Sequence, residues 1–166
     1  MILICLHFFS IAQSRWEPHQ NTGLLILNEG DTLGFSTGYQ LELGVRRVFD
    51  RDTLDDFFSV FMGASVKYFQ WYNQIKKSNE RSFSVSGEIG FTPVNDVYFS
   101  VNAMYLSGLN AFVPHVTVEG RPFDRFITPR LNLVFSMEGG FIKYLSKPTS
   151  PTGFVSLSVG VIYEIK

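Results

Sequence analysis

The 166-residue chain has few charged residues, one cysteine and no long apolar run. The lone cysteine, Cys5, has no partner for an internal disulfide, which excludes a small disulfide-stabilised scaffold. A helical membrane span needs about 20 consecutive apolar residues, and no segment supplies them. Charged residues make up 17% of the chain, against about a quarter in an average soluble domain. The net charge is −1 and no Lys/Arg cluster occurs, which argues against nucleic acid as a partner.

Hydrophobic residues are nevertheless abundant, and they are dispersed by alternation. They make up 45% of the sequence, which contains 17 phenylalanines. In the segment 34–49, the odd-numbered residues from Phe35 onward are mostly apolar, whereas the even-numbered residues are mostly small or charged. A period of two is typical of a β-strand whose two faces meet different surroundings. The sequence shows no convincing helical periodicity.

The same alternation recurs along most of the chain and predicts six strands directly. They are expected within 34–49, 58–69, 83–92, 97–106, 131–142 and 155–166. Between them, Thr92–Asp96 is typical of a tight turn, Tyr72–Ser82 of a longer polar loop and Leu145–Thr152 of a Pro- and Ser-rich loop. The lengths of the connections suggest two further strands, at Leu24–Leu27 and Ala111–Glu119, if the tight turn and both ends of the chain lie on the same side of the barrel. The total is then eight, an even number as in closed bacterial barrels.

Two architectures would bury the apolar face of these strands. In a soluble lipocalin-like barrel or sandwich the apolar faces pack on each other, and the outer face is normally rich in Lys, Glu, Thr and Arg. Here the polar face is rich in Ser and Gly with isolated charges, which suits the narrow lumen of an eight-stranded barrel. The apolar face then meets lipid, and aromatic rings near the strand ends suit the membrane interfaces. We therefore predict an all-β fold, an antiparallel up-and-down transmembrane β-barrel of eight strands.

Residues 1–12 predict a signal peptide, and residues 13–166 the barrel. The apolar run Ile2–Ile11 is too short to cross a bilayer, and the small residues Ser10 and Ala12 suit cleavage after Ala12. The basic residues expected before such a run are absent, which indicates a truncated or misassigned start. The alternative for this run is a buried first strand. A cleaved signal would export the protein, and together with the predicted membrane barrel it leads us to expect the bacterial outer membrane.

At the level of pattern, Gly23–Lys166 resembles the small outer-membrane β-barrel proteins of diderm bacteria, of the OmpX, OmpA transmembrane-domain and OmpW kind. The resemblance implies a place among outer-membrane lipid and lipopolysaccharide, and it specifies architecture better than activity. We expect a non-enzymatic structural or interaction role in the envelope, with another envelope protein as a candidate partner. In that family the last strand carries the signal read by the barrel-assembly machinery, usually ending on an aromatic residue. This chain ends Glu164-Ile165-Lys166, and Tyr163 is its nearest ring.

Charged residues on the predicted inner face form the main candidate site. They are Glu42, Arg46, Lys67, Glu88, Glu138 and Glu164. A buried charge that is not paired costs several kcal/mol. We therefore expect these side chains to form an ion-pair network that fills the lumen. A gated or selective narrow channel is the alternative.

A second candidate is the stretch that contains His115, Thr117 and Glu119. Strand alternation puts the three on one face, and a base, a hydroxyl and a carboxylate are the groups of nucleophilic catalysis. Outer-membrane lipid A deacylases, which are small barrels, use a His-x-Ser pair with a Glu. Here Thr117 stands where Ser is expected, and Glu119 is spaced too closely. We therefore favour a solvated hairpin near a loop, and an enzyme acting on outer-membrane lipid stays the alternative.

Two charged loops complete the candidates. Asp50–Asp56 carries four aspartates, which could bind a divalent cation, but their spacing does not match an EF-hand and a solvated turn is favoured. Lys76, Lys77 and Arg81 could touch anionic lipopolysaccharide headgroups if their loop faces outward, although a plain solvated loop is favoured. No metal-binding Cys/His spacing, phosphate-binding loop or nucleotide motif occurs, so we expect no metal and no cofactor.

Overall fold

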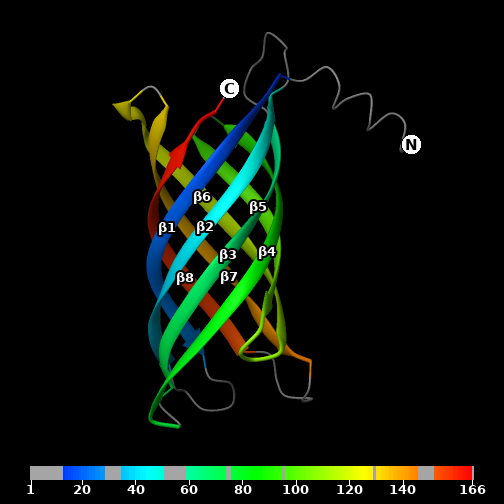
Figure 1. The fold of residues 1–166 in the computed structure, drawn as a ribbon, viewed down its shortest axis with the longest axis vertical. Helices are drawn as coiled ribbons and strands as arrows, with labels where there is room; N and C mark the ends of the chain where they lie inside the picture. Colours follow the sequence, from blue (N-terminus) through cyan, green and yellow to red (C-terminus); the bar gives the residue numbers. More distant parts are fainter. Residues whose placement is uncertain are drawn as a thin grey trace, which may run out of the picture.

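The computed structural model describes residues 13–28, 35–50, 59–73, 76–94, 96–128, 130–145 and 152–165, and these form eight strands. The strands are β1 (Gln13–Asn28), β2 (Phe35–Asp50), β3 (Ser59–Asn73), β4 (Ser78–Val94), β5 (Val97–Leu106), β6 (Ala111–Thr128), β7 (Leu131–Tyr144) and β8 (Thr152–Tyr163). Each pairs antiparallel with the next, and β8 pairs with β1, so the sheet closes into an up-and-down barrel (Figure 1). The described ranges contain no helix of the length and apolarity that crossing a membrane would take.

The barrel has two ends, which we call the terminal end and the far end. At the terminal end, at the top of Figure 1, β1 begins and β8 ends. Reciprocal backbone hydrogen bonds of 2.9 and 2.8 Å join Trp16 and Ile165 there. The tight turn between β4 and β5 lies at this end as well, and Asp96 adopts a φ of 65° in it, a conformation that Asp tolerates better than most residues. The tip of the β3–β4 hairpin lies at the far end.

The predicted fold class, an antiparallel eight-stranded barrel, is confirmed, and the bounds of β5 agree with the prediction. The predicted bounds of the other strands differ from those in the structure, most of all in three segments. The first strand begins at Gln13 and not at Leu24, and β6 continues past Glu119 to Thr128. Most of the segment predicted as a polar loop at Tyr72–Ser82 is strand, since β3 ends at Asn73 and β4 begins at Ser78. The predicted signal peptide and most of Asp50–Asp56 lie outside the described residues.

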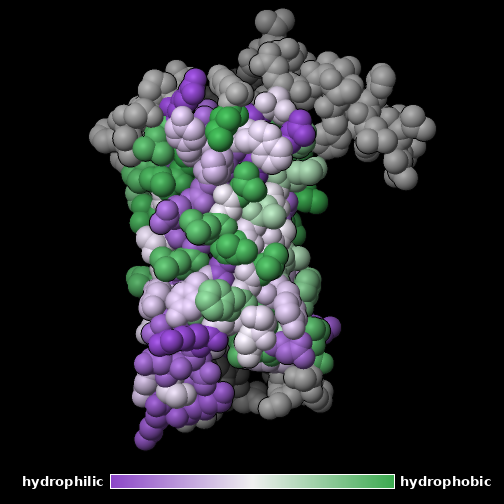
Figure 2. All heavy atoms as spheres, viewed as in Figure 1, coloured by the Kyte–Doolittle hydropathy of each residue, from purple (hydrophilic) through white to green (hydrophobic). Residues whose placement is uncertain are grey.

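Alternation gives the barrel wall two faces of opposite polarity. On β2, Gln40, Glu42 and Arg46 point inward and are buried, whereas Leu41 and Leu43 point outward and are 45% and 58% exposed. The other strands repeat this pattern over much of their length, although β1 carries polar side chains on its outer face and the inward side chains near the far end are apolar. The described residues include 30 large hydrophobic side chains that are exposed. Figure 2 shows mainly green and pale side chains over the middle of the wall, and purple ones gathered over the tip of the β3–β4 hairpin. Polar side chains thus line the lumen except near the far end, and the outer wall is mainly apolar.

Candidate functional site: a filled barrel lumen

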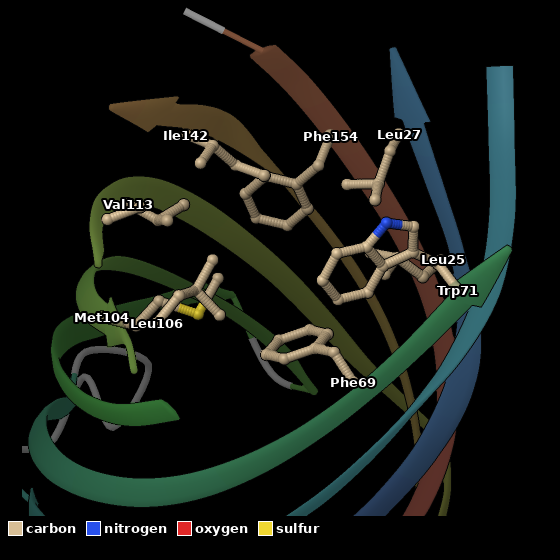
Figure 3. Close-up of a cluster of buried hydrophobic side chains, with 10 residues drawn as sticks. Leu25, Leu27, Phe69, Trp71, Met104, Leu106, Val113, Ile142 and Phe154 are labelled. Carbon is tan, nitrogen blue, oxygen red and sulfur yellow. The ribbon is translucent and has the colours of Figure 1, made fainter. Parts of the chain in front are cut away.

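An apolar layer closes the far end of the lumen (Figure 3). Its buried members are Leu25, Leu27, Phe69, Trp71, Met104, Leu106, Ala111, Val113, Ile142 and Phe154. They come from β1, β3, β5, β6, β7 and β8, and the side chains labelled in Figure 3 point toward one another across the barrel. The pocket among them holds only about 20 Å³ and is lined by apolar side chains alone. That is room for one or two water molecules, which would find no polar partner there.

Next to the apolar layer, on the side toward the terminal end, lies an ion-pair group that we call the Lys67 cluster, made of Glu42, Lys67 and Glu138. The Lys67 ammonium donates a hydrogen bond of 2.7 Å to Glu138 Oε1 and lies 3.3 Å from Glu42 Oε1. The amide of Asn21 donates a further bond of 3.0 Å to Glu42. Lys67 is on β3 and Glu138 on β7, which lie opposite each other in the ring of strands. This contact therefore crosses the full width of the lumen.

A second ion-pair group, the Arg46 cluster, lies closer to the terminal end and consists of Glu17, Arg46, Glu119 and Arg121. Arg46 binds both carboxylate oxygens of Glu119, at 3.1 and 2.5 Å, and donates a bond of 2.9 Å to Glu17. Arg121 bridges the same two carboxylates, at 2.6 Å to Glu17 and 3.2 Å to Glu119. Two acids and two bases thus alternate around a closed circuit, so each charge has at least two opposite neighbours, and Glu17 also pairs with Arg15 at 2.8 Å. Because β2 and β6 also lie opposite each other, this cluster spans the lumen too.

Aromatic rings pack against the Arg46 cluster toward the terminal end. The guanidinium of Arg46 lies 5.0 Å from the ring centre of Phe61 and 5.1 Å from that of Tyr98. Arg121 lies 3.8 Å from the Tyr98 ring. Cation–π contacts of this kind are strongest when the cation is desolvated, and both arginines are buried. The two rings, packed with Val48 in one buried group, thus fill space that water would otherwise occupy.

All six charged residues predicted from the sequence point into the lumen, but they do not form one network. Glu42, Lys67 and Glu138 meet in the Lys67 cluster, and Arg46 belongs to the other cluster. Glu88 packs beside Arg46 against Gly63, where a Cβ would overlap the Glu88 carboxylate. The Glu88 Oε1 atom has no hydrogen-bond partner among the described residues. Glu164 lies near the terminal end, 3.8 Å from Arg121, with its side chain 20% exposed.

Sequence reasoning missed Glu17 and Arg121, which are central to the Arg46 cluster. Glu17 is fully buried and contacts both Arg46 and Arg121. The sequence does contain an indication of Glu17, because polar residues recur at every second position of β1. They are Arg15, Glu17, His19 and Asn21, which occupy successive inward positions. Arg121 likewise follows Glu119 by two residues. Extending the predicted strand 111–119 by one inward position reaches Arg121, whereas the predicted strand 24–27 has to be extended backward by four inward positions to reach Glu17.

The solvated hairpin favoured for His115, Thr117 and Glu119 is wrong. All three point into the lumen, where His115 is 3% and Glu119 6% exposed. Glu119 is held by the two arginines, and Thr117 accepts a hydrogen bond of 2.9 Å from Asn102. The His115 Nδ1 atom lies 3.2 Å from the Val113 carbonyl, and its Nε2 has no hydrogen-bond partner among the described residues. The imidazole is therefore not in contact with the Thr117 hydroxyl, as a base activating a nucleophile would be.

The remaining charged candidates lie at the far end or outside the described residues. Lys76 and Lys77 are exposed at the β3–β4 tip, and Lys76 forms an ion pair of 3.1 Å with Glu80. Arg81 is exposed on the neighbouring part of β4. Within the described ranges, no group of three or more His, Cys, Asp or Glu side chains is placed to hold a metal ion.

Comparison with known proteins does not indicate a function, so the functional proposal rests on the barrel. No family model matches the chain, and no curated protein is detectably similar to it in sequence. Two properties of the barrel bear on function. Its lumen is blocked by an apolar layer and two cross-lumen ion-pair clusters, and its outer wall is apolar.

Proposed function

We propose that this chain is an outer-membrane β-barrel whose filled lumen does not conduct, with a structural or interaction role in the bacterial envelope. The observation that carries the proposal is the polarity of the wall. Seven charged side chains are buried inside the barrel: Glu17, Glu42, Arg46, Lys67, Glu119, Arg121 and Glu138. The exposed large hydrophobic side chains of the strands lie on the outer face. A barrel with charges inside and apolar side chains outside is stable when lipid surrounds its wall.

A soluble lipocalin-like barrel is the main rival, and the polarity argues against it. Such a barrel holds an apolar ligand inside and presents a polar surface to water. The largest exposed apolar patch of a typical soluble monomer covers about 300–600 Å². Here exposed Leu, Val, Phe, Ile and Met side chains recur along the outer face of each strand. In water this wall would cause aggregation. In a bilayer its apolar side chains contact acyl chains, so their exposure costs little free energy.

The outer aromatic rings support a membrane-spanning orientation. Near the far end, Tyr68 packs against Tyr39 and Phe83, with ring centres 6.1 and 5.0 Å apart. Near the terminal end, Phe91 and Phe99 stack at 6.0 Å. On β4, Phe83 and Phe91 bound an apolar outer stretch of about 27 Å at ~3.4 Å per residue. A strand tilt of ~40° reduces this to about 20 Å along the barrel axis, close to the ~25 Å apolar band of bacterial barrels.

The blocked lumen favours a structural or interaction role over transport. The Lys67–Glu138 and Arg46–Glu119 contacts cross the barrel between opposite strands. Removing a charge from its partner inside the lumen costs several kcal/mol, so thermal motion does not open a path through both clusters. The outer wall and the two ends then carry the contacts with partners. We propose outer-membrane lipid and lipopolysaccharide as the surroundings of the wall, and the barrel-assembly machinery as the reader of β8.

The proposal is tested by refolding the urea-denatured chain in parallel into detergent micelles and into plain buffer. Each sample is run on a cold SDS gel with and without boiling. We expect a band that depends on micelles and changes mobility on boiling, because a closed barrel resists SDS until heated. A protein that folds and stays monodisperse in buffer without detergent, with no mobility shift, would overturn the membrane assignment.

A planar-bilayer recording tests the blocked lumen separately. The refolded protein is expected to give no discrete conductance steps at a protein concentration at which a known porin, added as the positive control, inserts and conducts. Regular steps that scale with salt concentration would refute the filled lumen and support the narrow-channel alternative.

A further inference from the structure

The outer wall is interrupted by polar side chains at one place in its middle. Gln20 and Thr22 lie at the centre of β1, point outward and are exposed. Each is flanked by apolar outward residues on both neighbouring strands. Gln20 pairs across the sheet with Leu43 and Val161, and Thr22 pairs with Leu41 and Val159. All four flanking side chains are exposed, so the two polar side chains form a small island in an apolar surface.

Other polar side chains of the described outer wall, tyrosines apart, lie within three residues of a strand end. They are Ser14, Asn28, Thr37, Arg47, Gln70, Asn79, Arg81 and Lys143. Three of these, Ser14, Arg47 and Gln70, have partners within the chain. The Gln70 carbonyl oxygen accepts hydrogen bonds from Tyr39 and Tyr68 at 3.0 and 2.9 Å. The Arg47 guanidinium binds Ser14 at 3.0 Å and stacks on Trp16.

We propose that two copies of this chain associate through β1, with Gln20 at the centre of the contact; this rests on the proposed membrane location. The structure gives no side-chain hydrogen bond to Gln20 or Thr22 within the described ranges. An acyl chain offers neither a donor nor an acceptor, so an amide facing lipid is left unsatisfied. Hydrogen bonds between polar side chains are one of the forces that associate protein segments within a bilayer.

A second copy is the occupant whose chemistry fits the island. A primary amide has both donors and an acceptor, so two Gln20 side chains related by a two-fold axis can each donate to the other. The Thr22 hydroxyl likewise donates and accepts. A two-fold dimer presents the same patch from both partners, and this patch complements itself. Nothing charged needs to be matched, because the surrounding side chains are Leu and Val.

The geometry of a tilted strand makes the contact compact. With the two-fold axis along the membrane normal and strands tilted by ~35–45°, the two β1 strands cross at roughly 80° and meet at one point. Only side chains near the crossing touch, so Gln20 and Thr22 supply the polar centre. Leu43 on β2 and Val161 on β8, which are 58% and 37% exposed, pack around it. The dimer is thus held by a few side chains and dissociates on dilution in detergent.

Sedimentation equilibrium of the refolded protein in density-matched micelles, at several protein-to-detergent ratios, tests the association. We expect a monomer–dimer equilibrium in the unaltered chain. The double variant Gln20→Leu with Thr22→Val is expected to weaken it at least tenfold. The control is Thr37→Val, which removes an outward hydroxyl near the start of β2 and is expected to leave the association unchanged. Heat-modifiability on a cold gel verifies that each variant has folded.

Oxidative cross-linking in liposomes provides the second measurement. In a Cys5→Ser background, Gln20→Cys is expected to form a covalent dimer, whereas Val101→Cys, on the outer face of β5, is not. A folded, heat-modifiable protein that is monomeric at every ratio would overturn the dimer and leave the membrane proposal standing. So would a Gln20→Leu, Thr22→Val variant that associates as strongly as the unaltered chain. A protein that gives no micelle-dependent barrel would instead refute the membrane proposal itself.

Discussion

Replacing Lys67 by methionine tests whether the cross-lumen ion pairs hold the barrel together. Methionine keeps most of the length of the lysine side chain and removes its charge. Lys67 is 3% exposed and is the cation between Glu42 and Glu138. Without it, two carboxylates remain in the same part of the lumen with no lysine between them. The chain offers a matched control in Lys76, which pairs with Glu80 at the far-end tip with its side chain 63% exposed.

The expected loss of stability follows from burial. Removing one partner of a buried ion pair costs about 3–5 kcal/mol, because the other partner stays buried and uncompensated. That lowers the ratio of folded to unfolded protein about 100- to 4,000-fold. Removing one partner of an exposed pair costs about 0–1 kcal/mol. With a urea dependence of ~2 kcal/mol per molar, the midpoint of Lys67→Met should fall by about 1.5–2.5 M, and that of Lys76→Met by less than about 0.5 M.

Urea unfolding in micelles, followed by the fluorescence of Trp16 and Trp71, measures both midpoints. A second change provides an internal check. Adding Glu138→Gln to Lys67→Met removes one of the two uncompensated carboxylates and should recover part of the lost stability. Equal midpoint shifts for Lys67→Met and Lys76→Met would refute the reasoning, since the lumen would then solvate these charges as well as bulk water does.

Three further results are expected. Gly160→Ala should lower the unfolding free energy by about 1–3 kcal/mol, because its Cβ would overlap the Asn21 side chain. A Cβ at Gly87 meets nothing within 4 Å, so Gly87→Ala should change the unfolding free energy by less than about 1 kcal/mol. A larger loss for Gly87→Ala than for Gly160→Ala in urea titrations would contradict this packing. Trp71→Ala should cost about 3–5 kcal/mol by opening the apolar layer, and a loss below about 1 kcal/mol in the same titration would show the layer to be loosely packed. His115→Ala should leave the lipid A species of the host membrane unchanged by mass spectrometry, and a changed acylation pattern would revive the lipid-modifying enzyme.

The sequence was sufficient where each strand separates an apolar from a polar face, and insufficient where it does not. On β5, small or polar inward residues alternate with apolar outward ones through Val97–Asn102, and the predicted bounds agree with the structure. On β1 the pattern is lost twice. At 19–22 both faces are polar, because Gln20 and Thr22 point outward, and at 24–27 both are apolar, because Leu25 and Leu27 enter the apolar layer. Only the pairing of β1 with β2 and β8 reveals the full strand.

The hairpin tip and the ion-pair partners were beyond the sequence for different physical reasons. Near Asn73 and Ser78 both faces of the β3–β4 hairpin carry polar residues, so the ladder continues with no contrast in polarity to reveal it. The inward direction of Arg46 and Lys67 follows from alternation alone. Which carboxylate each one meets depends on how the strands are staggered around the ring. Arg46 and Glu119 are 73 residues apart in the chain, and no local pattern encodes that distance.

The pairing of opposite strands has a consequence for the order of events during folding. Arg46 and Lys67 belong to the first half of the chain, whereas their cross-lumen partners Glu119 and Glu138 belong to the second. A sheet of β1–β4 alone therefore contains Arg46 and Lys67 without their cross-lumen carboxylates. Its polar face has to stay hydrated until β6 and β7 have joined the sheet. Closure of the ring brings those ligands in and expels the water in the same step. We therefore expect folding without a long-lived half-barrel, with a rate set by these non-local contacts.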